Sequence, residues 1–139
     1  MDSVLFSHNS DEWCTPQDFY DNLNDEFSFT LDPCSTDSNC KCIKHYTAAD
    51  NGLLKSWAGE TVFCNPPYSD IKAWVKKCYE ESLNDNTTVV LLIPSRTDTS
   101  YFHDYILGKA EIRFIRGRLK FGDAKKSAPF PSLVAVYRK

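Results

Sequence analysis

The longest apolar run in the sequence, Val89-Val90-Leu91-Leu92-Ile93, constrains the fold more than any other feature. Such a run is far too short to span a membrane. A strand that is apolar at every position is typical of a parallel sheet, because helices cover both faces of such a sheet. We therefore predict that Thr87 to Ile93 forms a fully buried strand.

Strand and helix patterns alternate along the rest of the chain. Apolar residues at three- and four-residue spacing predict helices within residues 15–27, 71–83 and 102–106. Further strands are predicted at Phe29–Leu31, Thr61–Cys64, Ile112–Phe121 and Leu133–Tyr137. This alternation indicates an α/β fold with a mainly parallel sheet flanked by helices. The length of 139 residues suits one domain, 1–139, in which we expect residues 1–12 to form a loosely ordered N-terminal segment.

The first helix has a start signal in Thr15-Pro16-Gln17-Asp18. Thr15 is predicted to be the N-cap and Pro16 the first helical residue, and Asp18 supplies a carboxylate three residues after the cap. The local pattern thus gives Thr15 a structural role before any function is considered.

Three predicted strands end in prolines or polar residues. Asp32-Pro33 follows the first strand, Asn65-Pro66-Pro67-Tyr68 the second, and Pro94-Ser95-Arg96 the third. In parallel sheets ligands bind beyond the carboxyl ends of the strands. The two prolines after Asn65 also fix the backbone and cannot donate to a sheet ladder. We therefore expect a rigid ligand site at this edge.

Charge is distributed unevenly along the chain. Residues 1–70 contain three basic and twelve acidic side chains, whereas residues 71–139 contain thirteen basic and seven acidic ones. The segment 113–126 is the most basic, with six basic side chains and one acidic. This polarity fits a protein that contacts a polyanion on one side, although a solvated charged surface would give the same pattern.

The six cysteines are expected to be reduced, because the N-terminus lacks the basic and apolar regions of a secretory signal. A cytoplasmic protein without membrane association is therefore expected. Cys40, Cys42 and His45 could contribute to a zinc site, but Cys-x-Cys is tighter than the usual spacing and no second pair follows. Ordinary loop cysteines are the preferred interpretation, and no metal is assigned.

A set of motifs in fixed order covers most of the chain from Asp11 to Ser132. The motifs are "DEWCTPQDFYDNL", "LDPCS", "AADNGL", "FCNPPYS", "LLIPSRTDTSYF" and "IRFIRGRLKFGDAKKSAPFPS". Together they resemble the small phage-type DNA N-6-adenine methyltransferases, which use S-adenosylmethionine. This resemblance implies a compact Rossmann-like methyltransferase fold, and methyl transfer to the N6 amine of an adenine flipped out of duplex DNA.

The resemblance assigns the catalytic role to Asn65, Pro66, Pro67 and Tyr68. The exocyclic amine of adenine is a weak nucleophile because its lone pair is delocalised into the ring. The Asn65 side-chain carbonyl and the Pro66 backbone carbonyl could accept hydrogen bonds from that amine and favour a pyramidal nitrogen. Alignment with the methyl donor would supply much of the rate, and Tyr68 would stack on the base.

The resemblance also assigns residues to the cofactor. These are Trp13, Thr15, Pro16, Asp32, Pro33 and Asp50. The Asp32 carboxylate would face the amino-acid end of S-adenosylmethionine. Asp50 would meet its adenine amine, although Asp-Asn-Gly also suits a plain turn. The loop after Pro33, "CSTDSNC", contains no glycine, so close approach of its backbone to a ligand does not follow from the sequence.

The basic segment 113–126 is expected to face DNA. Arg116, Arg118 and Lys120 would neutralise phosphates, Phe121 would line the base pocket, and Arg96 could do either. Covalent catalysis by the Pro33-Cys34 dipeptide is rejected, because the catalytic strand ends in Asn-Pro-Pro-Tyr. RNA and protein-glutamine methyltransferases share that motif and remain alternatives. So does a catalytically silent DNA-binding module of the same fold, which the missing glycines motivate.

Overall fold

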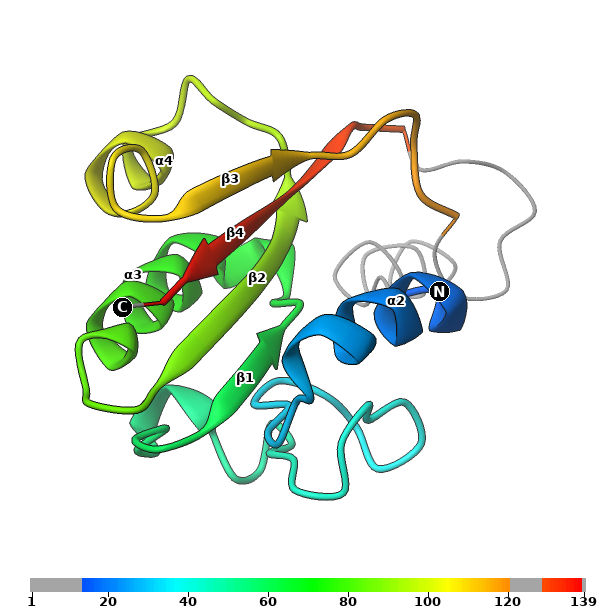
Figure 1. Ribbon diagram of the computed structural model, residues 1–139, viewed down its shortest axis with the longest axis vertical. Coiled ribbons are helices and arrows are strands. Elements are labelled where there is room, and N and C mark those ends of the chain that lie inside the picture. Colours follow the sequence, from blue (N-terminus) through cyan, green and yellow to red (C-terminus); the bar gives the residue numbers. More distant parts are fainter. Residues whose placement is uncertain (1–13, 121–128, 139) are drawn as a thin grey trace, which may run out of the picture.

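The computed structural model describes residues 14–120 and 129–138, in which helices and strands alternate (Figure 1). The mixed α/β class predicted from the sequence is confirmed. The helices are α2 (Gln17–Phe27), α3 (Ile71–Ser82) and α4 (Ser100–Tyr105), with short 3-10 helices η1 (Gly52–Leu54) and η2 (Tyr68–Asp70). The strands are β1 (Thr61–Cys64), β2 (Thr88–Pro94), β3 (Glu111–Phe114) and β4 (Ser132–Tyr137). None of the helices in these ranges has the length and apolar character needed to cross a membrane.

Within the described ranges the strands form one four-stranded sheet in the order β1-β2-β4-β3. β1 pairs in parallel with β2, from Thr61 opposite Thr88 to Cys64 opposite Leu91. β4 lies between β2 and β3 and is antiparallel to both (Figure 1). The prediction of a mainly parallel sheet is therefore wrong, because two of these three pairings are antiparallel.

The connection between β3 and β4 explains the reversal. Its described parts, 115–120 and 129–131, contain no helix. A parallel neighbour needs a crossover, usually helical, whereas a direct return gives an antiparallel neighbour. Because β2 and β3 both run opposite to β4, the strands β1, β2 and β3 point the same way. Their carboxyl ends therefore meet at one edge of the sheet.

Two predicted strands are shorter than expected. In place of the strand Phe29–Leu31, single parallel bridges join Leu31 to Val62 and Asp32 to His45. In place of the strand Ile112–Phe121, β3 ends at Phe114. Gly117 has a φ of +76°, which does not fit a continuous strand. The residue Phe121 lies outside the described ranges.

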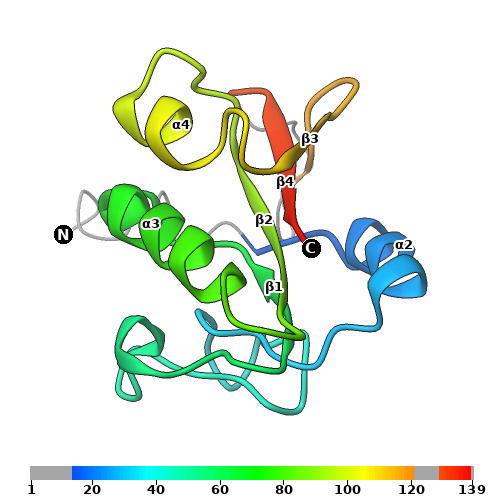
Figure 2. The same cartoon turned by 60° about the vertical axis from the view of Figure 1, so that its left-hand side comes forward.

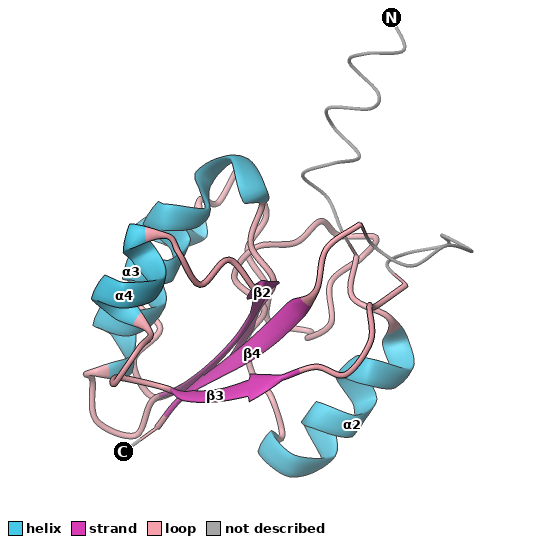
Figure 3. Cartoon of the chain, turned by 90° about the horizontal axis from the view of Figure 1, so that it is seen from above, coloured by secondary structure: helices cyan, strands magenta, loops and turns pink. Residues whose placement is uncertain are grey.

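Helices cover both faces of the sheet (Figures 2 and 3). α3 and α4 lie on one face, where the odd-numbered residues of β2 from Val89 to Ile93 join the larger core. α2 lies on the other face, where Val90 and Leu92 join the smaller core. All five of these β2 residues are at most 1% exposed, so the predicted burial is confirmed for 89–93, although the strand begins one residue later than predicted and its first residue, Thr88, is partly exposed.

α2 begins one residue later than the sequence predicts. Pro16 is the N-cap, with φ −57° and ψ 135°, and its carbonyl accepts the first helical bond from Tyr20 N at 3.0 Å. No side chain caps this helix. The prediction of Thr15 as N-cap and Pro16 as first helical residue is therefore wrong, because the Thr15 hydroxyl is engaged by Asn65 outside the helix.

Candidate functional site

A cavity of about 370 Å³ lies at the carboxyl edge of the sheet. Its wall combines the segment before α2, the loop after Asp32, the turn at η1 and the chain that leaves β1. Four of the predicted site residues line it, namely Thr15, Asp32, Asn65 and Pro67. The volume is in the range of small-molecule sites in proteins. The cavity thus brings the predicted cofactor and catalytic segments together.

Asp32 presents a buried carboxylate to this cavity. It is 4% exposed and accepts a hydrogen bond of 2.9 Å from the backbone N–H of Lys41. Loss of solvation raises the pKa of the Asp32 carboxyl, although the hydrogen bond from the Lys41 N–H opposes the shift. A buried carboxylate with a raised pKa would be stabilised in its ionised form by a cation in the cavity.

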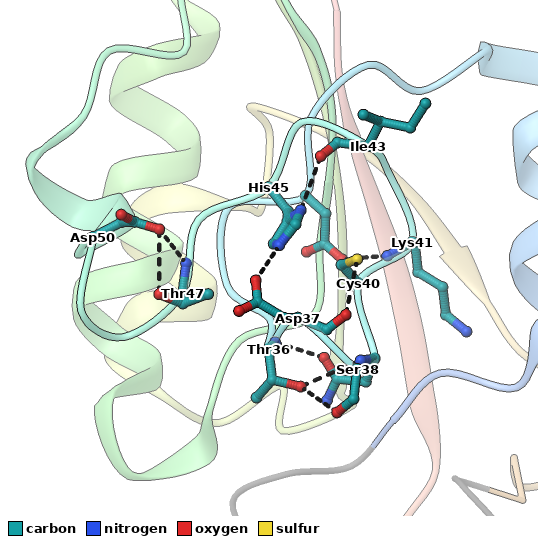
Figure 4. A network of polar contacts seen from close by, with 11 residues as sticks. Thr36, Asp37, Ser38, Cys40, Lys41, Ile43, His45, Thr47 and Asp50 are labelled. Carbon is teal, nitrogen blue, oxygen red and sulfur yellow. Dashed lines mark hydrogen bonds and ion pairs between the residues drawn. The ribbon is translucent and has the colours of Figure 1, made fainter.

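The glycine-free loop after Asp32 is shaped by its own side chains (Figure 4). Asn39 Oδ1 accepts from the backbone N–H of Thr36 at 2.7 Å, and Asn39 Nδ2 donates to Cys14 Sγ at 3.3 Å. His45 bridges Asp37 Oδ1 at 2.8 Å and the Ile43 carbonyl at 2.9 Å. Asp37 holds the pKa of the half-buried His45 ring above its ordinary value, with help from the Ile43 carbonyl. Side-chain bonds thus give this loop its shape, although it contains no glycine.

Asp50 belongs to the turn before η1, next to residues that line the cavity. The exposed Asp50 carboxylate accepts from the N–H and the hydroxyl of Thr47, at 2.9 and 3.2 Å, so it closes a turn beside the cavity. These bonds lower the Asp50 pKa. Asn51 and Gly52, not Asp50, line the cavity. A Cβ on Gly52 would lie 2.1 Å from the Pro33 carbonyl oxygen, so Gly52 permits this turn to pack directly on buried Pro33.

Asn65 directly follows β1 and is held at two points. Its Nδ2 donates to Thr15 Oγ1 at 2.9 Å, and Thr15 is 5% exposed. Its backbone carbonyl accepts from Cys34 Sγ at 3.3 Å. Cys34 Sγ also lies 3.6 Å from Cys64 Sγ, and burial raises the pKa of both thiols. Asn65 is thus tied to the segment before α2 and to the loop after Asp32.

The two prolines after Asn65 are followed by an aromatic pair. Pro66 is buried, and Pro67 lines the cavity. The Tyr68 ring packs edge-on against Phe130, with ring centroids 5.4 Å apart, and it lies beyond the residues that line the cavity. Burial raises the pKa of the Tyr68 phenol. The motif therefore faces two environments, the cavity at Asn65 and Pro67 and an aromatic contact at Tyr68.

The predicted DNA-facing cations are exposed near the same edge. Arg96 follows the carboxyl end of β2, and Arg116, Arg118 and Lys120 follow the carboxyl end of β3. Arg113, in the same basic segment, differs because it forms a bidentate ion pair with Glu26 at 2.7 Å and a further pair with Glu111. It belongs to a surface ion-pair network that joins α2 to β3.

Two predicted site residues, Trp13 and Phe121, lie outside the described ranges. The cysteine and histidine residues considered for zinc contact other residues, not one another. Cys40 Sγ contacts the Asp37 carbonyl, Cys42 Sγ lies 3.5 Å from Tyr20 Oη, and His45 pairs with Asp37. The described part of the chain contains no group of three or more ligating side chains that could hold a metal ion. All six cysteines are free thiols.

Sequence reasoning missed several residues that line the cavity. They are Cys14, Asn39, Asn51, Gly52, Asp70 and Trp74. Gly52 was the easiest to find, because the Asp-Asn-Gly turn contains it. Nothing in the sequence marked Trp74 or Asp70 as a site residue. Trp74 has the spacing of an ordinary core residue of α3, and Asp70 is a charged residue directly before that helix.

The cavity lies at the carboxyl ends of the strands, with the buried carboxylate of Asp32 on one segment and the hydrogen-bonded amide of Asn65 on the next. Such an arrangement is typical of α/β enzymes that bind a small molecule at the edge of the sheet. The family is shown by comparison with known proteins. The chain belongs to the DNA N-6-adenine-methyltransferase (Dam) family, whose model matches residues 2–133. The family resemblance inferred from the motifs is therefore confirmed.

Two phage proteins are among the relatives. The DNA N-6-adenine-methyltransferase of Haemophilus phage HP1 (strain HP1c1) is 30% identical over 109 residues, which cover 77% of this chain and 63% of the relative. The protein of the same name from Escherichia phage T1 is 32% identical over 112 residues, covering 78% of this chain and 46% of the relative. The chain thus spans less than two thirds of the length of each of these relatives.

Proposed function

We propose that this protein transfers a methyl group from S-adenosylmethionine to the N6 amine of adenine in DNA. The observation that carries the proposal is that Asp32 and Asn65 line one cavity, on segments joined by the parallel bridge of Leu31 and Val62. Membership of the family, and the names of the two phage relatives, support adenine in DNA as the acceptor.

The cavity suits S-adenosylmethionine in charge and in shape. When bound, this cofactor supplies an electrophilic methyl group on a sulfonium. Its cationic amino-acid end would stabilise the ionised form of buried Asp32, whose pKa is raised by desolvation. Gly52 lets its turn pack closely on Pro33, and the bonds of Asn39 shape the loop after Pro33 although that loop lacks glycine. A cavity of this kind, present despite the missing glycines, argues against the alternative of a catalytically silent DNA-binding module. Pro33 and the turn closed by Asp50 would border the cofactor, with Asn51 and Gly52 nearest to it.

Asn65 and Pro66 would act on the acceptor amine. The Asn65 Oδ1 and the Pro66 carbonyl would accept hydrogen bonds from the N6 hydrogens, which favours a pyramidal nitrogen with its lone pair available. The prolines limit the backbone rotation of this segment. The amide does not need to remove a proton before attack, so orientation is its main contribution.

The target base would enter from the side of Tyr68. A base in a duplex must be flipped out to reach such a site, and stacking on an aromatic ring offsets part of the cost. The contact between Tyr68 and Phe130 marks a place for such stacking near the cavity. Exposed Arg96, Arg116 and Lys120, together with Arg118, would contact phosphates.

The fold supports the proposal at the level of architecture. We infer a Rossmann-like methyltransferase arrangement, in which β1, β2 and β3 run in one direction and β4 is inserted in the opposite direction. We also infer a single methyltransferase domain over 1–139, because the described elements share one sheet and its two covering layers.

The test is methyl transfer from labelled S-adenosylmethionine to three acceptors: unmethylated duplex DNA, RNA, and a glutamine-containing protein. The DNA is then digested to nucleosides, and N6-methyldeoxyadenosine is measured by mass spectrometry. We expect label in DNA only, on adenine. Label in RNA or in protein would replace the proposed acceptor, and tight binding of the cofactor without transfer to any of the three would reject the reaction.

A further inference from the structure

The hydroxyl of Thr15 is used in a way that helix formation does not explain. A threonine beside a helix start usually caps that helix. Here Pro16 is the N-cap and no side chain caps α2. Thr15 Oγ1 instead accepts a hydrogen bond of 2.9 Å from Asn65 Nδ2, a residue 50 positions away in the sequence. Because Thr15 is only 5% exposed, water competes little for this bond.

This bond restrains how the amide of Asn65 is turned. An asparagine amide has a donor end, Nδ2, and an acceptor end, Oδ1, which have nearly the same shape. Since Nδ2 points at Thr15, Oδ1 occupies the other end of the amide plane. The Cys34 thiol restrains the same residue through the backbone carbonyl, at 3.3 Å. Side chain and backbone of Asn65 are therefore both fixed before any acceptor arrives.

We propose that Thr15 is a positioning residue for the transfer reaction, because its hydroxyl holds Nδ2 of Asn65 and so directs Oδ1 toward the acceptor amine. The inference rests on the proposed function. Thr15 acts through Asn65 in this proposal, which is a different role from the cofactor contact that the family resemblance implies. The cavity that both residues line would receive the methyl donor and the acceptor side by side.

The expected effect follows from the geometry. Without the hydroxyl the amide can turn over and present Nδ2, a donor, to an amine that needs an acceptor. A misplaced group at a reacting centre costs about 100-fold in rate. We expect Thr15→Val, which keeps the shape and removes the hydroxyl, to lower the single-turnover rate of methylation by about 10- to 100-fold at saturating cofactor and DNA.

The experiment compares three variants of the full chain. Thr15→Val removes the hydroxyl, Thr15→Ser keeps it, and Thr88→Val makes the same change at the amino end of β2, at the opposite edge of the sheet. The single-turnover rate is measured together with the affinity for S-adenosylmethionine by calorimetry. We expect a slow Thr15→Val enzyme with near-normal cofactor affinity, and near-normal rates for Thr15→Ser and Thr88→Val.

Three results would overturn the proposal. Thr15→Val could show the wild-type rate, it could regain that rate once higher cofactor concentration compensates for weaker binding, or Thr15→Ser could be as slow as Thr15→Val. The second result would return Thr15 to a cofactor contact.

A second readout separates this inference from the proposed function. The side-chain amide of Asn65 is followed by nitrogen-15 NMR, with its resonance assigned by its loss in Asn65→Asp. Protection from solvent exchange in the wild type that disappears in Thr15→Val supports the hydrogen bond, even if the wild type methylates no DNA and the proposed function fails. An unprotected amide in the wild type overturns the positioning role.

Discussion

Gly52→Ala is the substitution that most directly tests the wall of the cavity. A Cβ at this position would lie 2.1 Å from the Pro33 carbonyl oxygen and 3.1 Å from the Trp74 ring. An ordinary carbon–oxygen contact is roughly 3.3 Å, so the turn or Pro33 must move by about 1 Å. Overpacking of this kind costs about 1–3 kcal/mol. Because Pro33 directly follows Asp32, the movement also displaces the carboxylate proposed to face the cofactor.

We therefore expect Gly52→Ala to lower the free energy of unfolding in urea by about 1–3 kcal/mol and to weaken binding of S-adenosylmethionine by at least about tenfold. Gly59→Ala is the matched control. Gly59 has φ +79° with no heavy atom within 4 Å of an added Cβ, so its cost is backbone strain of about 1–2 kcal/mol. Its cofactor affinity should not change. Wild-type affinity in Gly52→Ala, or an equal loss in Gly59→Ala, would refute the reasoning.

Three further predictions concern the reaction and its partners. Asn65→Ala should abolish methylation, because Asn65 is proposed to bind the acceptor amine, while its calorimetric affinity for S-adenosylmethionine stays within about threefold of the wild-type value. Near-normal turnover in this variant would remove Asn65 from the mechanism. Arg118→Ala with Lys120→Ala should reduce the slope of log affinity for DNA against log salt by about 2, whereas Arg113→Ala, whose cation is paired with Glu26 and Glu111, should leave the slope unchanged. Equal slopes in all three proteins would place the DNA surface elsewhere. Burial raises the pKa of Asp32, so the carboxyl should ionise at a pH above the range that is ordinary for an aspartate. Cofactor affinity should therefore rise with pH through that range and then level off. Asp32→Asn should remove this dependence in a calorimetric pH series, and an unchanged pH profile in this variant would argue against Asp32 as the group that meets the cation.

Several helices and strands could be predicted from the sequence, because their patterns depend on residues that are close together in the chain. Thr61–Cys64 was predicted with the bounds that β1 has, and the apolar spacing after Ile71 gave α3. The direction of β4 could not be predicted from the sequence. Leu133–Tyr137 is apolar in the same way as β2, and nothing in such a run tells whether it lies parallel or antiparallel to its neighbours.

The site was predictable in outline and not in its details. Asp32 and Asn65 were found because each follows a strand, and strand ends meet at one edge. The hydrogen bond between Asn65 and Thr15 was not predicted, because a local capping rule gave Thr15 another role and the bond joins residues 50 positions apart. The glycine-free loop looked unfavourable, yet the side chain of Asn39 shapes it through hydrogen bonds with Thr36 and Cys14.

The burial of β2 on both faces has a consequence for how such a protein can diversify. Strand and covering helices form a frame that tolerates little change, since each inward position of β2 is at most 1% exposed. The segments that leave the carboxyl ends of β2 and β3 contain exposed runs instead, at 96–98 and 116–118. Under the proposed function, new target preferences would arise by exchange or lengthening of such segments, while the interior stays as it is. Recognition and foldability would then be carried by different residues and would evolve at different rates.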